Sequence, residues 1–140
     1  MSRSTAPITW SDALTTGVTT MDEQHKILVN MINEANYLLD ETTGRDVYME
    51  VVKDLISYAL YHFDDEEELM ITAQYPQDRR QHHIEEHRAF SRKVTTIQQE
   101  LVQGKLINRD ELIGYLNHWL VNHIMGTDQQ LGKALLAPGK

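Results

Sequence analysis

The sequence contains no cysteine, which excludes disulfides, thiolate-bound zinc and iron–sulfur clusters held by cysteine. Histidine and carboxylate side chains are the protein metal ligands that remain, and the chain has seven histidines. Any metal site in this protein must therefore be built from imidazole and carboxylate groups.

Long apolar runs are also missing. The unbroken runs at Ile27–Val29 and Leu69–Ile71 are far shorter than the roughly 20 residues that a membrane-spanning helix needs. Residues Met1–Pro7 are polar and lack the apolar core of a secretory signal. We therefore predict no membrane insertion and a cytoplasmic location.

An excess of positive charge is absent as well, since the formal net charge is −8. Nucleic acids and anionic membranes bind clustered lysine and arginine, so we expect neither as a partner. The acidic balance mainly favours solubility.

Four segments carry residues at alternating spacings of four and three, the pattern of one buried face of a helix. With 140 residues, 41% of them hydrophobic, the chain can build one continuous core. The four stripes are Met21, His25, Leu28, Ile32, Ala35 and Leu39; Tyr48, Val52, Leu55, Ala59, His62, Glu66 and Leu69; His83, His87, Phe90, Val94, Ile97 and Leu101; and Leu112, Leu116, Trp119 and His123.

Breaks between the stripes fall at Thr42–Gly44, Tyr75–Pro76 and Gly104. Short connections between long helices favour antiparallel neighbours. We predict an all-α fold, namely an up-down-up-down antiparallel four-helix bundle over residues 20–136.

Residues 1–19 are predicted to form an N-terminal arm, or loop, that precedes the bundle, with Met1–Pro7 as a loose beginning. Thr20 with Glu23 resembles a capping box at the start of the first helix. Asn108 is predicted to cap the fourth helix.

Six polar residues occupy stripe positions where leucine, isoleucine or valine would be usual. Burying one unpaired polar group costs about 2–7 kcal/mol, so six of them need partners. A single core histidine is more often a hydrogen-bonded structural residue, but independent structural histidines have no reason to align on four stripes. Shared coordination of metal ions explains the whole set: His25, His62, Glu66, His83, His87 and His123.

Residues four apart project from the same face of a helix, as His62 and Glu66 do, and likewise His83 and His87. The other two histidines, His82 and His118, lie off the stripes and are predicted to be at the surface. The acidic residues that surround Glu66 are predicted to form a solvated helix face: Asp64, Asp65, Glu67 and Glu68.

Four short motifs together resemble the hemerythrin family, in particular its single-domain bacterial members. They are Met21-Asp-Glu-Gln-His25, His62-Phe-Asp-Asp-Glu66, His83-Ile-Glu-Glu-His87 and Trp119-Leu-Val-Asn-His123-Ile-Met-Gly-Thr-Asp128. The resemblance spans nearly the whole chain and is highly specific, and every ligand position of the family pattern is filled.

The resemblance implies two non-haem iron ions. One would be bound by His83, His87 and His123 and the other by His25 and His62. Glu66, Asp128 and a solvent-derived oxo or hydroxo group would bridge them. Iron rests on the family pattern, because imidazole and carboxylate also suit zinc, manganese and copper.

Asp128 lies five residues beyond His123, which is about 140° around a regular helix. The stripe pattern alone does not find it, and the helix must deviate before it. Gly126 allows a bulge, a tightening or an early helix end, and π-type irregularities are frequent at functional sites.

The family pattern gives the first iron six donors and the second five, so the second keeps an open position. This implies reversible binding of O2 as a hydroperoxide on the five-coordinate iron, for oxygen transport or storage. Trp119, Leu120 and Ile124 are predicted to form part of the oxygen pocket, although ordinary bundle packing explains Trp119 equally well. We expect a monomer that supplies an oxygen-consuming enzyme and is not itself an enzyme.

Two other functions remain open at this point. One is an oxygen or redox sensor that signals through its surface. The other is a di-iron enzyme, such as a peroxidase, a nitric-oxide-handling protein or an iron-oxidising detoxifier, for which Tyr58, Tyr61 and Tyr115 are candidate redox residues.

Overall fold

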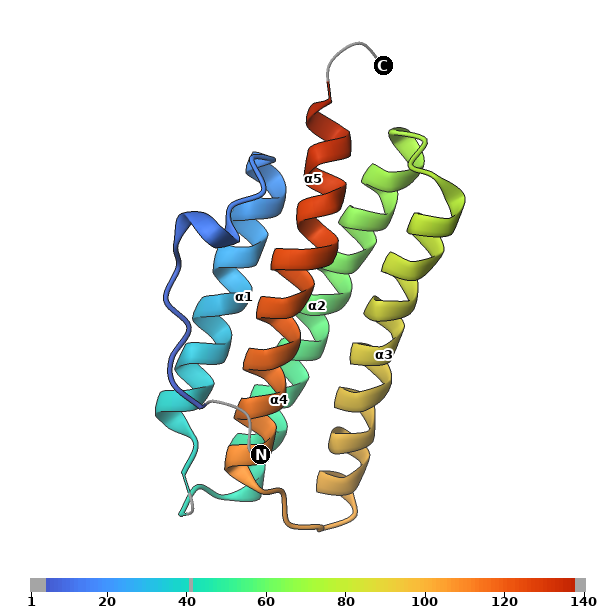
Figure 1. The fold of residues 1–140 in the computed structure, drawn as a ribbon. Helices are drawn as coiled ribbons and strands as arrows, with labels where there is room; N and C mark the ends of the chain where they lie inside the picture. The colour runs from blue at the N-terminus through green and yellow to red at the C-terminus, as the bar shows by residue number, and fades with distance from the viewer. Residues whose placement is uncertain (1–4, 41, 138–140) are drawn as a thin grey trace.

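The computed structural model describes residues 5–40 and 42–137, and these form the predicted four-helix bundle (Figure 1). Four helical stretches run alternately up and down, and no strand occurs within the described residues. The helices are α1 (Thr19–Leu38), α2 (Arg45–Thr72), α3 (Gln77–Val102), α4 (Arg109–Asn122) and α5 (Gln129–Leu136), with a π-helical segment, η2 (His123–Asp128), between the last two.

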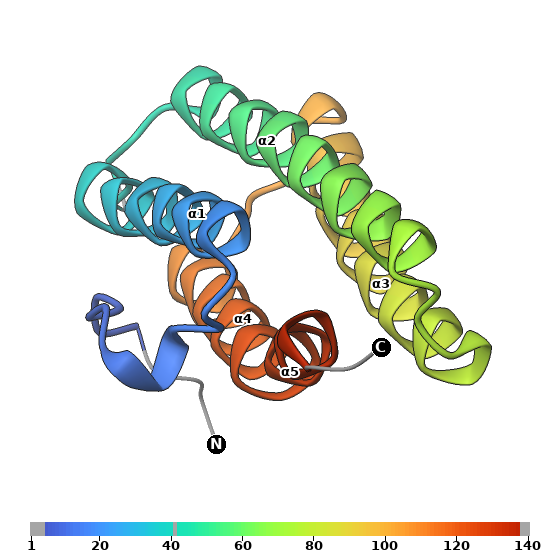
Figure 2. The ribbon, with the colours of Figure 1, turned by 90° about the horizontal axis from the view of Figure 1, so that it is seen from above.

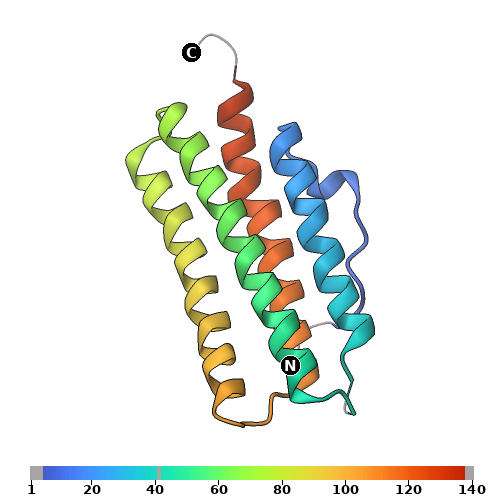
Figure 3. The ribbon, with the colours of Figure 1, turned by 180° about the vertical axis from the view of Figure 1, so that it is seen from behind.

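The helices surround a common axis when the molecule is seen from above (Figure 2), and α2 packs against both α1 and α3. Viewed from behind, α4 and α5 continue each other along the same direction (Figure 3). The fourth helical stretch therefore does not end early near Gly126, as one of the expected alternatives had it. It passes through η2 and continues to Leu136.

The breaks between helices lie where they were predicted, and the two that follow α2 and α3 have a local cause. Gly104 has a φ of +83°, and its N–H donates to the carbonyl of Leu101, which ends α3. Gln74 ends α2 in the same left-handed region, with a φ of +56° and without the help of a glycine. Pro76 then precedes the first residue of α3.

One of the two predicted caps is confirmed and the other is wrong. The side chain of Asn108 accepts a hydrogen bond from the Glu111 N–H at the start of α4. At the start of α1, however, no side-chain cap is formed. Instead, the carboxylate of Asp22 accepts hydrogen bonds from the backbone N–H groups of Thr16 and Gly17, so it ties the arm to the helix.

The N-terminal arm is anchored rather than loose over its described part. Asn36 donates to the carbonyl of Thr5, and Asn117 donates to that of Ala6. Asn33 both donates to the carbonyl of Ile8 and accepts from its N–H. The remaining residues of the predicted loose beginning, 1–4, lie outside the described residues.

Two apolar clusters fill the bundle, with a polar layer between them. The larger includes Leu28, Phe63 and Ile124, and the smaller consists of Met21, Met70, Tyr75 and Leu131. Along α1 the order is Met21, His25, Leu28, and Glu66 and Asp128 likewise lie between a residue of the larger cluster and one of the smaller. Apolar side chains therefore cover the polar layer on both sides. None of the described helices has the length and apolar content to cross a membrane.

Candidate metal centre

The structure brings all the predicted ligands together in the polar layer. Each is at most 3% exposed, and α1, α2, α3 and the π-helical segment each contribute at least one. The set is His25, His62, Glu66, His83, His87, His123 and Asp128.

Glu66 divides its two carboxylate oxygens between two groups of histidines. Its Oε2 atom lies 3.0 Å from Nε2 of His25 and 2.9 Å from Nε2 of His62. Its Oε1 atom lies 3.1 Å from Nε2 of His83 and 3.0 Å from Nε2 of His87. A carboxylate with one oxygen facing each group has the geometry of a bridge.

Asp128 repeats this division from the opposite side. Its Oδ2 atom lies 2.9 Å from Nε2 of His25, whereas its Oδ1 atom lies 3.1 Å from Nε2 of both His83 and His123. We define the three-histidine half as Oε1 of Glu66 and Oδ1 of Asp128 together with His83, His87 and His123. The two-histidine half consists of Oε2 of Glu66 and Oδ2 of Asp128 together with His25 and His62. The partition expected from the family pattern is thus present in the geometry.

The π-helical segment explains how Asp128 reaches the site. Its hydrogen bonds close wider turns than those of an α-helix, so residues five apart, such as His123 and Asp128, come to share a face. Gly126 is not sterically required for this turn, because a Cβ atom there would meet nothing within 4 Å. The contacts of Asp128 with the imidazoles stabilise the irregular turn.

The donor set fits a pair of bound cations. Both oxygens of Asp128 and Nε2 of His123 are buried without a partner of hydrogen-bond geometry among the described residues, although imidazole nitrogens and carboxylate oxygens lie about 3 Å apart. Two groups of donors are close enough to share an ion each: Glu66, His83, His87 and His123; and His25, His62, Glu66 and Asp128.

The electrostatics of the site also favour cations. Burial alone would lower the pKa of His25, but contacts with Asp128 and Glu66 outweigh burial and raise that pKa to about 9. Burial likewise opposes the charged form of His123, yet the charge of Asp128 raises its pKa well above the ordinary value. Burial opposes ionisation of Glu66, but the histidines, His62 first, hold its pKa well below its usual range. Burial and the charge of Glu66 oppose ionisation of Asp128 too, but His123 lowers its pKa below the usual range, so two ionised carboxylates share one buried site.

Several residues that the sequence patterns did not single out hold the far side of the imidazole rings. Glu67 Oε2 lies 2.9 Å from Nδ1 of His87, and Glu86 Oε1 lies 2.6 Å from Nδ1 of His123. Gln24 Oε1 lies 2.7 Å from Nδ1 of His62. Metal-bound imidazoles commonly donate their second N–H to such an acceptor, so acidic residues adjacent to candidate ligands were the available signal.

The acidic run around Glu66 is therefore only partly a solvated face. Asp64 and Glu68 are exposed as predicted. Asp65 accepts a 2.6 Å hydrogen bond from Gln24, and Glu67 contacts His87, so for these two residues the prediction was wrong. His82 and His118 are exposed, as predicted, although His82 forms a 2.7 Å ion pair with Glu86.

The predicted oxygen-pocket residues lie close to the site but differ in their surroundings. Trp119 stacks on the ring of His123, with 4.5 Å between ring centroids and 12° between ring planes. Leu120 and Ile124 are buried in the larger apolar cluster. Their role in an oxygen pocket stays a prediction.

Fold and site together define a four-helix-bundle protein with a buried histidine–carboxylate site, whose donors fall into two groups that could each hold a metal ion. Comparison with known proteins specifies the class further. Residues 16–135 match the family model described as "Hemerythrin HHE cation binding domain". The chain belongs to the hemerythrin family.

Named relatives agree with this assignment. A bacteriohemerythrin of Pseudomonas aeruginosa is 38% identical over 125 residues, which are 88% of this chain and 78% of that protein. One from Stenotrophomonas maltophilia is 34% identical over 89% of this chain and 78% of its own length. A crystal structure of wild-type hemerythrin superposes with a TM-score of 0.84 at 30% identity, covering 94% of this chain and all of that one.

Proposed function

We propose that the protein binds molecular oxygen reversibly, as a carrier or store, at two non-haem iron ions joined by Glu66, Asp128 and an oxo or hydroxo group. The observation that carries the proposal is the inequality of the two halves. The three-histidine half offers five protein donor atoms, whereas the two-histidine half offers four. The half with fewer donors has room for an exogenous ligand.

Iron is the metal that this proposal assigns to the site. The donors fit it in kind, and the matched relatives are named as hemerythrins. When bound, two ferrous ions supply the two electrons that an oxygen ligand takes up and returns. The residues of the chain hold the metal pair, orient it and keep water away from it.

The character of the donors favours binding over oxidation of a substrate. When bound to metal, the set would offer five neutral imidazoles and two carboxylates, whereas di-iron carboxylate proteins on similar bundles use four glutamates and two histidines. Anionic ligands stabilise highly charged iron better than neutral ones do. We therefore propose ligand binding without catalytic turnover, and delivery of oxygen to an oxygen-consuming enzyme.

The apolar clusters on both sides of the polar layer support reversibility. Leu28, Phe63 and Ile124 pack on one side and Met21 and Leu131 on the other, all nearly inaccessible to solvent. Excluding water from the site suppresses loss of reduced oxygen species, which would leave the irons oxidised.

The test is a cycle of oxygenation on purified, iron-loaded protein. After anaerobic reduction, air is admitted and then removed while the visible spectrum is recorded. A charge-transfer band that appears with air and disappears on deoxygenation, over repeated cycles, is the expected result. A single irreversible oxidation would contradict oxygen carriage, and rapid consumption of an added substrate would favour an enzyme.

A further inference from the structure

The two halves of the metal centre differ in what holds the outer nitrogens of their imidazoles. In the three-histidine half, carboxylates hold two of the three rings, Glu67 on His87 and Glu86 on His123. In the two-histidine half, the acceptor on His62 is the amide of Gln24. Nδ1 of His25 has no partner among the described residues, and neither has Nδ1 of His83 in the three-histidine half. The carboxylate acceptors thus belong to one half only.

Glu86 is held firmly for this task. Its Oε1 atom accepts from the hydroxyl of Thr127 at 2.7 Å in addition to its contact with His123, and its Oε2 atom pairs with His82. Both His123 and Thr127 belong to the π-helical segment. The carboxylate therefore fixes the ring and the turn that carries it.

Ring stacking adds to the rigidity of the same half. Phe63 stacks on His87 with 4.0 Å between centroids and 10° between planes, and Trp119 stacks on His123. In the other half, the phenyl ring of Phe63 lies 5.9 Å from the ring of His62, with 51° between the planes, so it is tilted and not stacked.

The orientation of Gln24 follows from Asp65. The carboxylate of Asp65 accepts from Nε2 of Gln24 at 2.6 Å, so the amide oxygen faces Nδ1 of His62. His62 therefore donates to a neutral oxygen, which polarises the ring less than a carboxylate does.

We propose that Glu67 and Glu86 are positioning residues that make the three-histidine half bind its iron more tightly and oxidise first. The amide of Gln24, in contrast, leaves the two-histidine half to bind its iron less tightly and to oxidise second. A carboxylate that accepts the Nδ1 proton raises the basicity of the coordinating Nε2. A more basic ligand stabilises the higher charge of ferric iron. This inference rests on the proposed di-iron function, because it assigns a different affinity and a different order of oxidation to the two ions.

The first experiment measures iron release from the reduced, iron-loaded protein to a ferrous chelator without oxygen. Wild type is expected to release its two irons in two phases of one ion each. Glu86→Gln, and separately Glu67→Gln, should accelerate the slow phase by about 10-fold or more and leave the fast phase unchanged. Thr127→Val, which removes only a support of Glu86, should shift the slow phase less.

Matched controls lie one position away on the same helices. Glu85→Gln and Glu68→Gln each remove the same charge from an exposed residue, and Glu85 pairs only with Arg92 in the described structure. Both controls should release iron as wild type does. Equal acceleration in a control variant would overturn the proposal.

The second experiment reverses the asymmetry. Gln24→Glu combined with Asp65→Asn places a carboxylate on His62 without repulsion from Asp65, and should slow the fast phase. A redox titration of each variant should show the separation between the two one-electron potentials narrowing, by about 59 mV for each 10-fold loss of preference. A merely structural role would leave that separation unchanged.

The outcomes separate this inference from the proposed function. Release of both irons in one phase from wild type, or unchanged potentials in Glu86→Gln, would refute the inference even if oxygen binds reversibly. Conversely, two phases with the expected shifts would uphold it even if the oxygenation cycle proved irreversible.

Discussion

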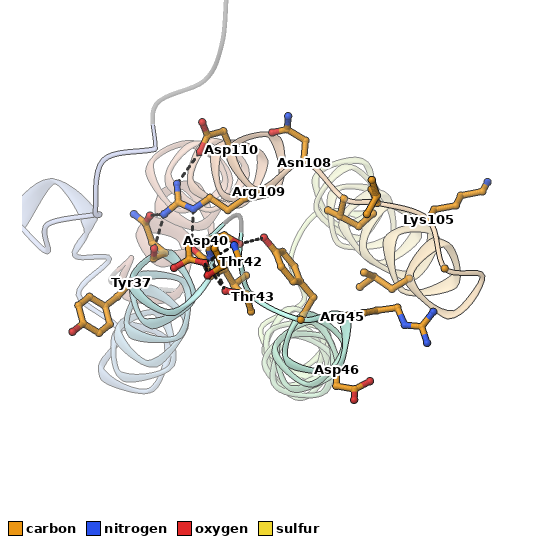
Figure 4. A pocket seen from close by; sticks show the side chains of 18 residues that line it. Tyr37, Asp40, Thr42, Thr43, Arg45, Asp46, Lys105, Asn108, Arg109 and Asp110 are labelled. Carbon is orange, nitrogen blue, oxygen red and sulfur yellow. Dashed lines mark hydrogen bonds and ion pairs between the residues drawn. The ribbon is translucent and has the colours of Figure 1, made fainter.

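The bundle contains two polar clusters that look similar in composition and differ in how their groups are paired. One is the metal centre. The other lies at the end of the bundle where α1 meets α2 and α3 meets α4, around a cavity of about 1290 Å³ (Figure 4). There, Arg109 donates to the backbone carbonyls of Asn36 and Leu39, and Asp40 accepts from Thr42 and Thr43.

At that end of the bundle, Arg109 and Asp40 have hydrogen-bond partners within the protein, so these groups need no bound ligand. At the metal centre, five imidazoles converge on two carboxylates, and Asp128 has no partner of hydrogen-bond geometry among the described residues. A polar cluster whose members pair with each other supports the fold, whereas one whose members converge on shared points is built for a ligand.

Breaking the bridge should have the largest effect. Glu66→Gln keeps the size of the side chain but removes the charge that faces both halves, so iron binding should weaken by at least roughly 100-fold, beyond the loss expected for an outer partner. Iron content per chain after dialysis against a chelator measures this. Asp110→Asn, an equal change at the other polar cluster, is the control and should retain both irons.

The pH dependence of stability should differ in sign between iron-loaded and stripped protein. In the stripped protein, the pKa of His25 is raised to about 9, so its stabilisation is present in full below about 6.5 and is lost as pH rises through about 9. The stabilisation that this raised pKa contributes at low pH is about 3 kcal/mol. In the loaded protein, protons compete with iron for imidazole nitrogens, so stability should fall on acidification.

Melting temperatures at pH 6 and pH 9.5, with and without iron, measure both trends. The stripped protein should melt at the higher temperature at pH 6, and the loaded protein at pH 9.5. Parallel trends in the two forms would show that the imidazoles do not exchange protons for metal.

At the other polar cluster, a substitution should change stability and nothing else. Arg109→Met removes the donors to two carbonyls at the end of α1, which should lower the free energy of unfolding by about 1–3 kcal/mol. Denaturant unfolding measures the loss, and iron content should remain at the wild-type value. Loss of iron would mean that the two clusters are coupled through α1.

Most of the fold and of the candidate site could be predicted from the sequence, because both depend on helical periodicity. A buried stripe fixes which residues share a face, so His62 and Glu66 were found by spacing alone. Asp128 was not, since its position depends on a π-helical turn that periodicity does not encode. The family pattern supplied it.

The outer partners were missed for a related reason. Gln24, Glu67 and Glu86 lie beside the stripes, where charged and amide residues are ordinarily solvated. Their role depends on which ring nitrogen faces outward, and that is set by tertiary packing. The cap predicted at the start of α1 was wrong for the same kind of reason. The carboxylate of Asp22 accepts from the backbone of the arm, and this contact depends on how the arm packs against the helix.

The smallest expected effect concerns the apolar wall rather than the donors. Leu120 is 3% exposed and belongs to the larger cluster beside His123. Leu120→Val shortens the wall, and Leu120→Thr has the same shape as valine but carries a hydroxyl, so the pair separates space from polarity. We expect autoxidation of the oxygenated form to be several-fold faster in the Leu120→Val variant and faster still in the Leu120→Thr variant, because each substitution admits water.

Leu101→Val is the control, since it removes a similar volume at the far end of α3 and should leave the autoxidation rate unchanged. Unchanged rates in both Leu120 variants would remove this residue from the oxygen pocket, whereas equal acceleration by valine and threonine would show that space alone controls water entry.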